Sequence, residues 1–265
     1  MSTAPYSALT MLAYQLDALE AARKAIENQH RAFTNPPKNA FDTAKNLAGT
    51  PAATLFESML KGIAVQEKDT IKKLEAATFA HPMAGAFVDA RLGIGLKGIG
   101  RLLGTIGDPL WNGSEDRLRR GPAELWAYCG YHTIPAGGHA TAEAHDPNFS
   151  GGNVRPRRQR GLKCNWSPRA KTAAFVVAES AYRQGYYRPV YVAEKDKAAT
   201  KVHCADCRNR VRPPGRPNGC GTVAHPEWGE PGSPWRPGHQ HQHALSMVAK
   251  TILKDLFVEA QSLAA

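Results

Sequence analysis

Residues 93–108 read Gly-Ile-Gly-Leu-Lys-Gly-Ile-Gly-Arg-Leu-Leu-Gly-Thr-Ile-Gly-Asp, and this stretch decides how the chain is expected to fold. Gly93 and Gly95 permit a tight turn between two helices, because glycine adopts backbone conformations that other residues avoid. The apolar residues after the turn recur at the spacing of one buried helix face: Ile99, Leu102, Leu103 and Ile106. The stretch therefore predicts a helix-hairpin-helix whose second helix is closed by Asp108 and Pro109.

Such a turn directs backbone amides at the N-terminus of the second helix, where an anion such as a backbone phosphate binds without any reading of base sequence. Lys97 and Arg101 add positive charge on the same side. We therefore predict a nucleic-acid-binding site formed by Gly93, Gly95, Lys97 and Arg101. The alternative is a glycine-rich turn that only joins two helices, since so short a motif is a weak signal.

The composition bounds the kinds of partner. The chain has 265 residues, of which 42% are hydrophobic, enough for one large or two modest domains. Its net charge of +11 favours a polyanion, and we expect DNA, with structured guide RNA as a further partner. The sequence has neither a signal peptide nor an apolar run of about 18 residues, so we expect a cytoplasmic protein without a membrane partner.

Two segments before the glycine turn predict a helical arm over residues 1–80. Apolar residues of the first segment recur at heptad-like spacing, with Arg23 and His30 at two positions of the seam: Leu12, Leu16, Leu19, Ile26 and Phe33. The second segment has a similar stripe: Phe56, Leu60, Ile63, Ile71 and Leu74. Three arrangements remain open: an antiparallel hairpin like a coiled coil, a coiled coil that joins two copies as a homodimer, and a pair packed on its own domain.

The remaining chain completes a mainly α fold. We expect a helix-hairpin-helix domain over residues 81–200, an irregular Cys/His-rich insert over 201–238, and a C-terminal helix over 239–265 that completes the domain. One helix is predicted by a face of small residues: Ala170, Ala173, Ala174, Val177, Ala178 and Ala181. The nearby tyrosines favour packing in the core over stacking on nucleotides: Tyr182, Tyr186, Tyr187 and Tyr191.

A glycine-rich segment that contains Ser150 leads into a run of positive charge. The run consists of Arg155, Arg157, Arg158, Arg160 and Lys163. Five cations so close together are typical of a strip that contacts phosphates, and we include all five in the predicted nucleic-acid-binding site. A solvated charge run is the alternative.

The insert contains a potential zinc site. Cys204 and Cys207 have the spacing with which two thiolates reach one tetrahedral zinc, and Cys220 lies in the same insert. His225 is the nearest candidate for the fourth ligand, and other histidines also qualify: His203, His239, His241 and His243. The insert is poor in apolar residues, so we predict a structural zinc that orders it. The alternative is a set of reduced thiols without metal.

Three elements in order resemble a known family. They are Gly93-Ile94-Gly95 through Ile106-Gly107-Asp108, then Ala127-Tyr128-Cys129-Gly130, then Ser150-Gly151-Gly152 leading into arginines. Together they resemble the C-terminal transposase domain of insertion-sequence transposases of the IS one-hundred-and-ten and IS one-hundred-and-sixteen type, whose relatives include the Piv-type DNA invertases. The resemblance covers most of the chain from about residue 5, apart from the insert.

The resemblance implies a role in DNA transposition or recombination. The family's serine in the Ser-Gly-Gly element is implicated in strand transfer, which makes Ser150 the candidate catalytic residue. Family members place before this domain an RuvC-like nuclease domain with four acidic metal-binding residues, whereas the first ninety residues here are helical and contain no Gly-Ile-Asp strand. We therefore expect a transposase-like DNA-binding protein that depends on a separate nuclease domain for Mg²⁺. Activity of the chain by itself stays open, and the alternative is a non-catalytic nucleic-acid-binding or regulatory remnant of a transposase.

Overall fold

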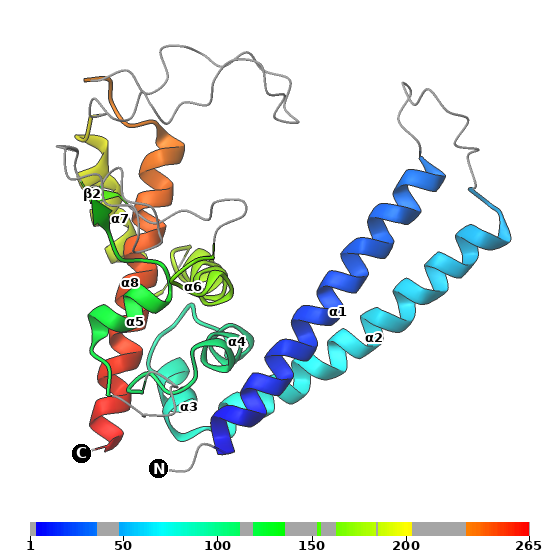
Figure 1. The fold of residues 1–265 in the computed structure, drawn as a ribbon, viewed down its shortest axis with the longest axis horizontal. Helices are drawn as coiled ribbons and strands as arrows, with labels where there is room; N and C mark the ends of the chain where they lie inside the picture. Colours follow the sequence, from blue (N-terminus) through cyan, green and yellow to red (C-terminus); the bar gives the residue numbers. More distant parts are fainter. Residues whose placement is uncertain are drawn as a thin grey trace. The chain divides into compact units, whose positions relative to one another are not determined.

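The computed structural model describes residues 4–35, 48–111, 119–135, 153–154, 163–183, 185–202 and 232–264. These residues form a mainly α fold, as the sequence predicts (Figure 1). The elements are α1 (Ala4–Thr34), α2 (Pro51–Ala80), α3 (Pro82–Asp89), α4 (Leu96–Ile106), α5 (Pro122–Tyr128), β1 (Ile134–Pro135), β2 (Asn153–Val154), α6 (Pro168–Ala181), α7 (Arg188–Ala199) and α8 (Pro237–Ala264). The chain divides into two compact units: Met1–Ala86 with Gly95–Gly107, and Phe87–Ile94 with Asp108–Ala265.

The first unit is built on α1 and α2, which pack side by side as an antiparallel hairpin within one chain (Figure 1). Pro51 occupies the first turn of α2, and the hydroxyl of Thr50 caps this helix by accepting from the amide of Ala53 at 3.4 Å. The seam of α1 faces α2, and its Arg23 donates to both carboxylate oxygens of Glu67 at 2.9 and 3.1 Å. Of the three arrangements open from the sequence, the arm therefore adopts the hairpin.

Helix α4 packs on this hairpin through two glycines spaced four residues apart. A Cβ on Gly104 would overlap the backbone carbonyl of Leu9 on α1 and lie 2.8 Å from Cβ of Ala13. A Cβ on Gly100 would overlap the hydroxyl of Thr78 on α2. Small residues at this spacing let helix backbones approach closely, so α4 belongs to the unit of the arm, although the sequence placed it in a domain that begins at residue 81.

The second unit is organised around α8, which contacts α5, α6 and α7. The six small residues that predicted a helix face are the buried residues of α6. The C-terminal helix is also present, and it begins at Pro237. The core prediction is confirmed for Tyr187 and Tyr191, which are 0% and 9% exposed, whereas Tyr186 is 55% exposed.

Three segments outside the described residues begin and end at neighbouring points of the second unit. Trp111 forms an antiparallel bridge with Arg119, which brings together the ends of residues 112–118. Strands β1 and β2 pair antiparallel on either side of residues 136–152, and Val202 pairs with Pro234 on either side of residues 203–231. The described residues that flank each segment are therefore paired with each other.

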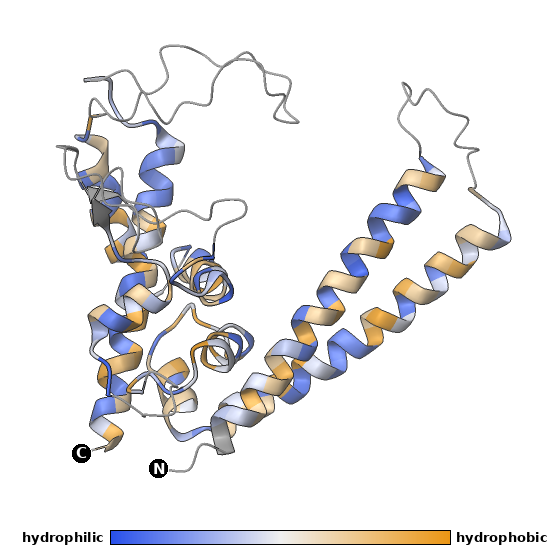
Figure 2. Cartoon of the chain, viewed as in Figure 1, coloured by the Kyte–Doolittle hydropathy of each residue, from blue (hydrophilic) through white to orange (hydrophobic). Residues whose placement is uncertain are grey.

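Hydrophobic and hydrophilic residues alternate along α1 and α2, as Figure 2 shows. Such alternation follows from helices that bury one side against a neighbour. In the part of the chain that the structure describes, no helix has the length and apolar character needed to cross a membrane.

Candidate nucleic-acid interface

The glycine turn follows α3 and begins with a residue in the left-handed region. Gly93 has a φ of 99°, and the amide of Ile94 donates to the carbonyl of Arg91 at 3.3 Å. Gly95 has extended backbone angles and is the N-cap residue of α4. The boundary between the two units falls between Ile94 and Gly95, so the predicted site residue Gly93 belongs to the second unit and Gly95, Lys97 and Arg101 belong to the first.

A second glycine turn holds the Gly93 turn in place within the second unit. The amide of Tyr186 donates to the carbonyl of Leu92 at 2.9 Å. Gly185 has a φ of 86°, and a Cβ there would overlap the same carbonyl. Glycine is therefore required at position 185 both for its backbone angles and for the close approach of the two turns.

Arg91 supports this arrangement, and the sequence interpretation did not single it out. Its guanidinium lies 4.0 Å from the ring centre of Phe87, and it is 3.4 Å from Glu259 and 3.9 Å from Asp255. Both carboxylates lie on α8, four residues apart and thus on one helix face. Arg91 therefore anchors the end of α3 to α8, and its charge is balanced within the second unit. The i, i+4 pair of carboxylates on α8 was the only sequence signal that could have indicated this role of Arg91.

A shallow cavity lies beside the turn. It is lined by Gly93 and by residues of α6 and the segment after it: Val176, Glu179, Ser180 and Arg183. The lining combines a cation, a carboxylate and a hydroxyl, so it is polar and of mixed charge. This cavity could hold a polar group, but its balance of charges does not favour an anion strongly.

The N-terminus of α4 is open. Gly95 is exposed, and among the described residues no side chain caps this helix end and no atom lies within 4 Å of a Cβ built on Gly95. The first amides of a helix have no partner inside the helix, so an uncovered end favours an anion. Lys97 lies in this first turn, with its ammonium 3.5 Å from a carboxylate oxygen of Glu20.

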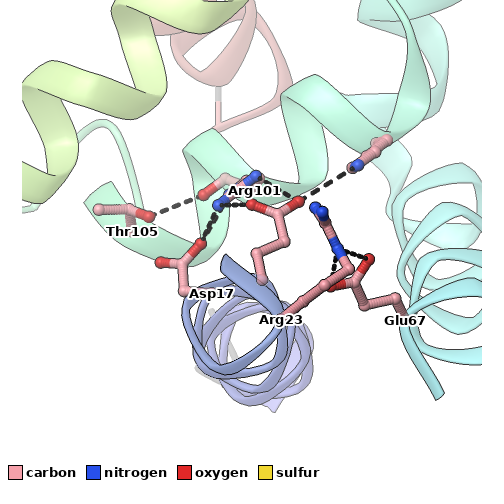
Figure 3. A network of polar contacts seen from close by, with 7 residues as sticks. Asp17, Arg23, Glu67, Arg101 and Thr105 are labelled. Carbon is pink, nitrogen blue, oxygen red and sulfur yellow. Dashed lines mark hydrogen bonds and ion pairs between the residues drawn. The ribbon is translucent and has the colours of Figure 1, made fainter. Parts of the chain in front are cut away.

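Arg101 lies one turn further along α4 and is engaged with α1 (Figure 3). Its Nε donates to Asp17 at 2.7 Å, while Nη1 and Nη2 donate to the two carboxylate oxygens of Glu20 at 3.2 and 2.8 Å. Burial by itself would raise the pKa of Glu20, but the hydrogen bonds and charges of Arg101 and Lys97 outweigh it and lower that pKa below its ordinary value. The structure thus brings Lys97 and Arg101 together on one carboxylate, where both charges are partly neutralised.

Most other predicted site residues lie outside the described residues. Of the basic strip, Lys163 is described and exposed, and the others are not described: Arg155, Arg157, Arg158 and Arg160. The candidate catalytic Ser150 and the predicted zinc ligands also lie outside: Cys204, Cys207, Cys220 and His225. Their roles stay predictions.

The alternative zinc ligands on α8 have other neighbours. His239 stacks on Trp235 with ring centres 4.2 Å apart, and Nδ1 of His241 lies 2.8 Å from the hydroxyl of Tyr191. His243 lies 3.8 Å from Glu194. Among residues with described positions, no three metal-binding side chains form a group that could hold an ion.

The chain matches no family model, no curated protein and no solved structure.

Proposed function

We propose that this protein binds DNA through backbone phosphates and serves a transposase-like role in DNA transposition or recombination. The carrying observation is the open N-terminus of α4, where exposed Gly95 leaves the first amides uncovered and Lys97 adds a cation. The net charge of +11 supports the same kind of partner, because a positive field attracts a polyanion over a distance. Phosphate binding of this type does not read base sequence.

The two predicted cations of α4 differ in how firmly their ion pairs hold them to α1. Arg101 is tied by three hydrogen bonds to Asp17 and Glu20, so its main contribution is to fix α4 on α1. Lys97 makes one long contact to Glu20 and its side chain is 39% exposed, so its ammonium can turn toward a phosphate at little cost. Lys97 is therefore the residue of this helix that we assign to DNA.

The chemistry of strand transfer is proposed from the resemblance. Ser150 supplies the hydroxyl, the arginines from Arg155 to Arg160 hold the phosphate, and a separate acidic nuclease domain supplies Mg²⁺. A serine hydroxyl without a base or metal is a poor nucleophile, so the protein by itself is proposed to bind without cutting. A structural zinc held by the insert, cytoplasmic location and a structured guide RNA complete the proposal.

Fluorescence anisotropy with a labelled duplex DNA tests the binding. If five phosphates are contacted, the affinity falls roughly several-hundred-fold between about 50 and 200 mM salt. Lys97→Ala should weaken binding to all sequences alike and reduce the slope of log affinity against log salt by about one. Lys72→Ala removes the same charge from an exposed position on α2 and should change the slope by much less.

The two variants separate a local site from a general charge effect. Binding that is absent, or that does not change with salt, would show the proposal to be wrong. Equal losses in Lys97→Ala and Lys72→Ala would remove α4 as the binding element while leaving an electrostatic interaction. A labelled RNA hairpin in the same titration tests whether duplex DNA is preferred.

A further inference from the structure

Helix α1 has a second heptad pattern that faces neither α2 nor α4. Its residues recur at alternating spacings of three and four, and every one is uncharged and exposed: Ala8, Met11, Gln15, Ala18, Ala22, Ala25, Gln29 and Ala32. Each precedes by one residue a position of the seam that faces α2. A heptad pattern maintained over this length is typical of a helix that packs against another helix.

Helix α2 continues the same pattern. Its exposed and uncharged residues at this spacing are Ala52, Leu55, Met59, Gly62 and Gln66, and the next two positions of the pattern carry Asp69 and Lys73, which pair with each other at 2.7 Å. They too precede by one residue the positions that face the partner helix, such as Ala53 and Glu67. An antiparallel pair is related by a two-fold axis perpendicular to both helices, so equal offsets from the facing seam lie on the same side of the pair. We name these thirteen residues of α1 and α2 the uncharged face.

Apart from Arg23 in the seam, the charges of α1 lie on the opposite side. Asp17, Glu20, Lys24, Glu27 and Arg31 each follow the seam by one residue, and the first two bind α4. A helix that is fully solvated carries charges all round its exposed surface. The separation of charged from uncharged residues on α1 is therefore not expected of such a helix. The uncharged face therefore has the composition of a buried surface, although within the first unit α4 covers only the other side.

Large apolar side chains and a hollow on the uncharged face also favour its burial against a partner. Met11, Leu55 and Met59 are 73%, 63% and 45% exposed. A shallow hollow, mostly apolar, is lined by Ala8, Met11, Leu12, Tyr14 and Gln15. Alanines elsewhere on the face would let another helix approach to about 8 Å, because they have little side chain to hold the backbones apart.

We propose that the uncharged face binds the same face of a second copy, so that two hairpins form a four-helix bundle. The thirteen residues carry no charge and the neighbouring Asp69 and Lys73 neutralise each other, so the face can meet itself without net like-charge repulsion, which fits an isologous contact. The run on α1 is about 37 Å long, that on α2 about 22 Å, and each helix is about 10 Å wide. The contact would bury about 600 Å² per copy and about 1,200 Å² in total, the lower end of stable specific interfaces. This inference does not depend on the proposed function.

Sedimentation equilibrium of the full chain tests the dimer. The wild type should associate with a dissociation constant in roughly the micromolar range, and high salt should not dissociate it, because the contact is apolar. Ala22→Glu places a charge in the uncharged face and should raise the dissociation constant at least about tenfold. Ala64→Glu introduces the same charge at an exposed position of α2 that follows the seam by one residue, on the side opposite the face, and should change it less than about twofold.

Each result supports or overturns the inference. Glutamate is a good helix former at exposed positions, so both variants should retain the helix content of the wild type in circular dichroism. A wild type that stays monomeric up to about 100 μM would overturn the inference, since an interface of this size should be populated there. So would a dimer that Ala22→Glu and Ala64→Glu weaken equally, because the contact would then lie on another surface.

Discussion

Arg101 and Glu20 form a two-pronged ion pair between α4 and α1, with Nη2 to Oε2 at 2.8 Å and Nη1 to Oε1 at 3.2 Å. Paired hydrogen bonds between a guanidinium and a carboxylate fix orientation as well as distance. Asp17 adds a third contact from the same face of α1 (Figure 3). The pair therefore sets the position of α4 along the hairpin.

We predict that Glu20→Gln makes the free energy of unfolding depend less on pH in the acidic range. The pKa of Glu20 is lowered in the folded state, so its stabilising contribution is present above its unfolded pKa of about 4.3 and is lost as the pH falls through the lower folded value. At neutral pH the substitution should cost about 1–2 kcal/mol. Urea denaturation at pH 7, 5, 4 and 3 gives the difference between wild type and variant.

That difference should shrink toward zero at the lowest pH. Glu75→Gln is the control, because Glu75 lies on α2 and no ion pair of it is found among described residues. A loss in Glu20→Gln that is constant from pH 7 to 3 would contradict the assignment of the stabilisation to the charged form of Glu20.

We predict that Gly104→Ala destabilises the first unit by about 2–3 kcal/mol, because its Cβ would overlap the carbonyl of Leu9 and α4 would have to move away from α1. Gly238→Ala makes the same change at the start of α8, where no described atom lies within 4 Å of the added Cβ. That control should be neutral or stabilise by up to about 1 kcal/mol. Thermal denaturation of Gly104→Ala, Gly238→Ala and the wild type measures the change in stability. Equal stability of the two variants would show that α4 does not need the close approach.

We predict that the five cysteines react with a thiol reagent in three stages. Burial raises the pKa of Cys129 to about 12, although nearby Arg120 opposes the rise, so this thiol should react only after unfolding. Cys164 is half-buried and should react in the native protein. Cys204, Cys207 and Cys220 should react only after a chelator removes zinc.

Metal analysis of protein purified without added zinc completes this test. One zinc per chain, and three thiols released by the chelator, would support the predicted site. Cys164→Ser is the control and should remove the first stage alone. A zinc content near zero, with three further thiols reactive before the chelator is added, would contradict a zinc site in the insert.

We predict that this chain and Mg²⁺ leave supercoiled plasmid intact, because the strand transfer proposed for Ser150 requires a separate acidic nuclease domain to activate its hydroxyl. If an RuvC-like partner is added, strand exchange should yield DNA covalently linked to Ser150, and Ser150→Ala should abolish the adduct while retaining DNA binding. Gel mobility and mass spectrometry of the adduct provide the measurement. Cleavage by the wild type in the absence of the partner that persists in Ser150→Ala would contradict both parts.

The helices could be predicted where a periodic apolar pattern exceeded two turns. The buried residues of α6 and the seam of α1 follow directly from spacing, because helix geometry alone decides which residues share a face. Helix α7 was missed because it is polar and short, with only Tyr191 and Ala198 buried. Its one sequence signal was Pro189 in the first turn.

The candidate site was less predictable than the fold. The spacing of Lys97 and Arg101 showed that they share a side of α4, but it could not show that Glu20 and Asp17, more than seventy residues away, would face them. Long-range pairing depends on which helices pack together, and periodicity within one helix carries no information about it. The Gly100 and Gly104 pair was the sequence signal for close packing of α4, and the sequence interpretation gave these two glycines no role.

Val202 forms an antiparallel bridge with Pro234, so the described residues on the two sides of residues 203–231 are held together. The carbonyl of Lys201 also accepts from the amide of Trp235 at 2.8 Å, so the two flanking stretches are joined by backbone hydrogen bonding. The entropic cost of closing a loop rises only slowly with its length. A segment between two joined stretches can therefore be lengthened or shortened with little effect on the helices that flank it. We therefore expect the flanking helices to stay folded when residues 203–231 are exchanged for another segment or replaced by a short turn from Val202 to Pro234.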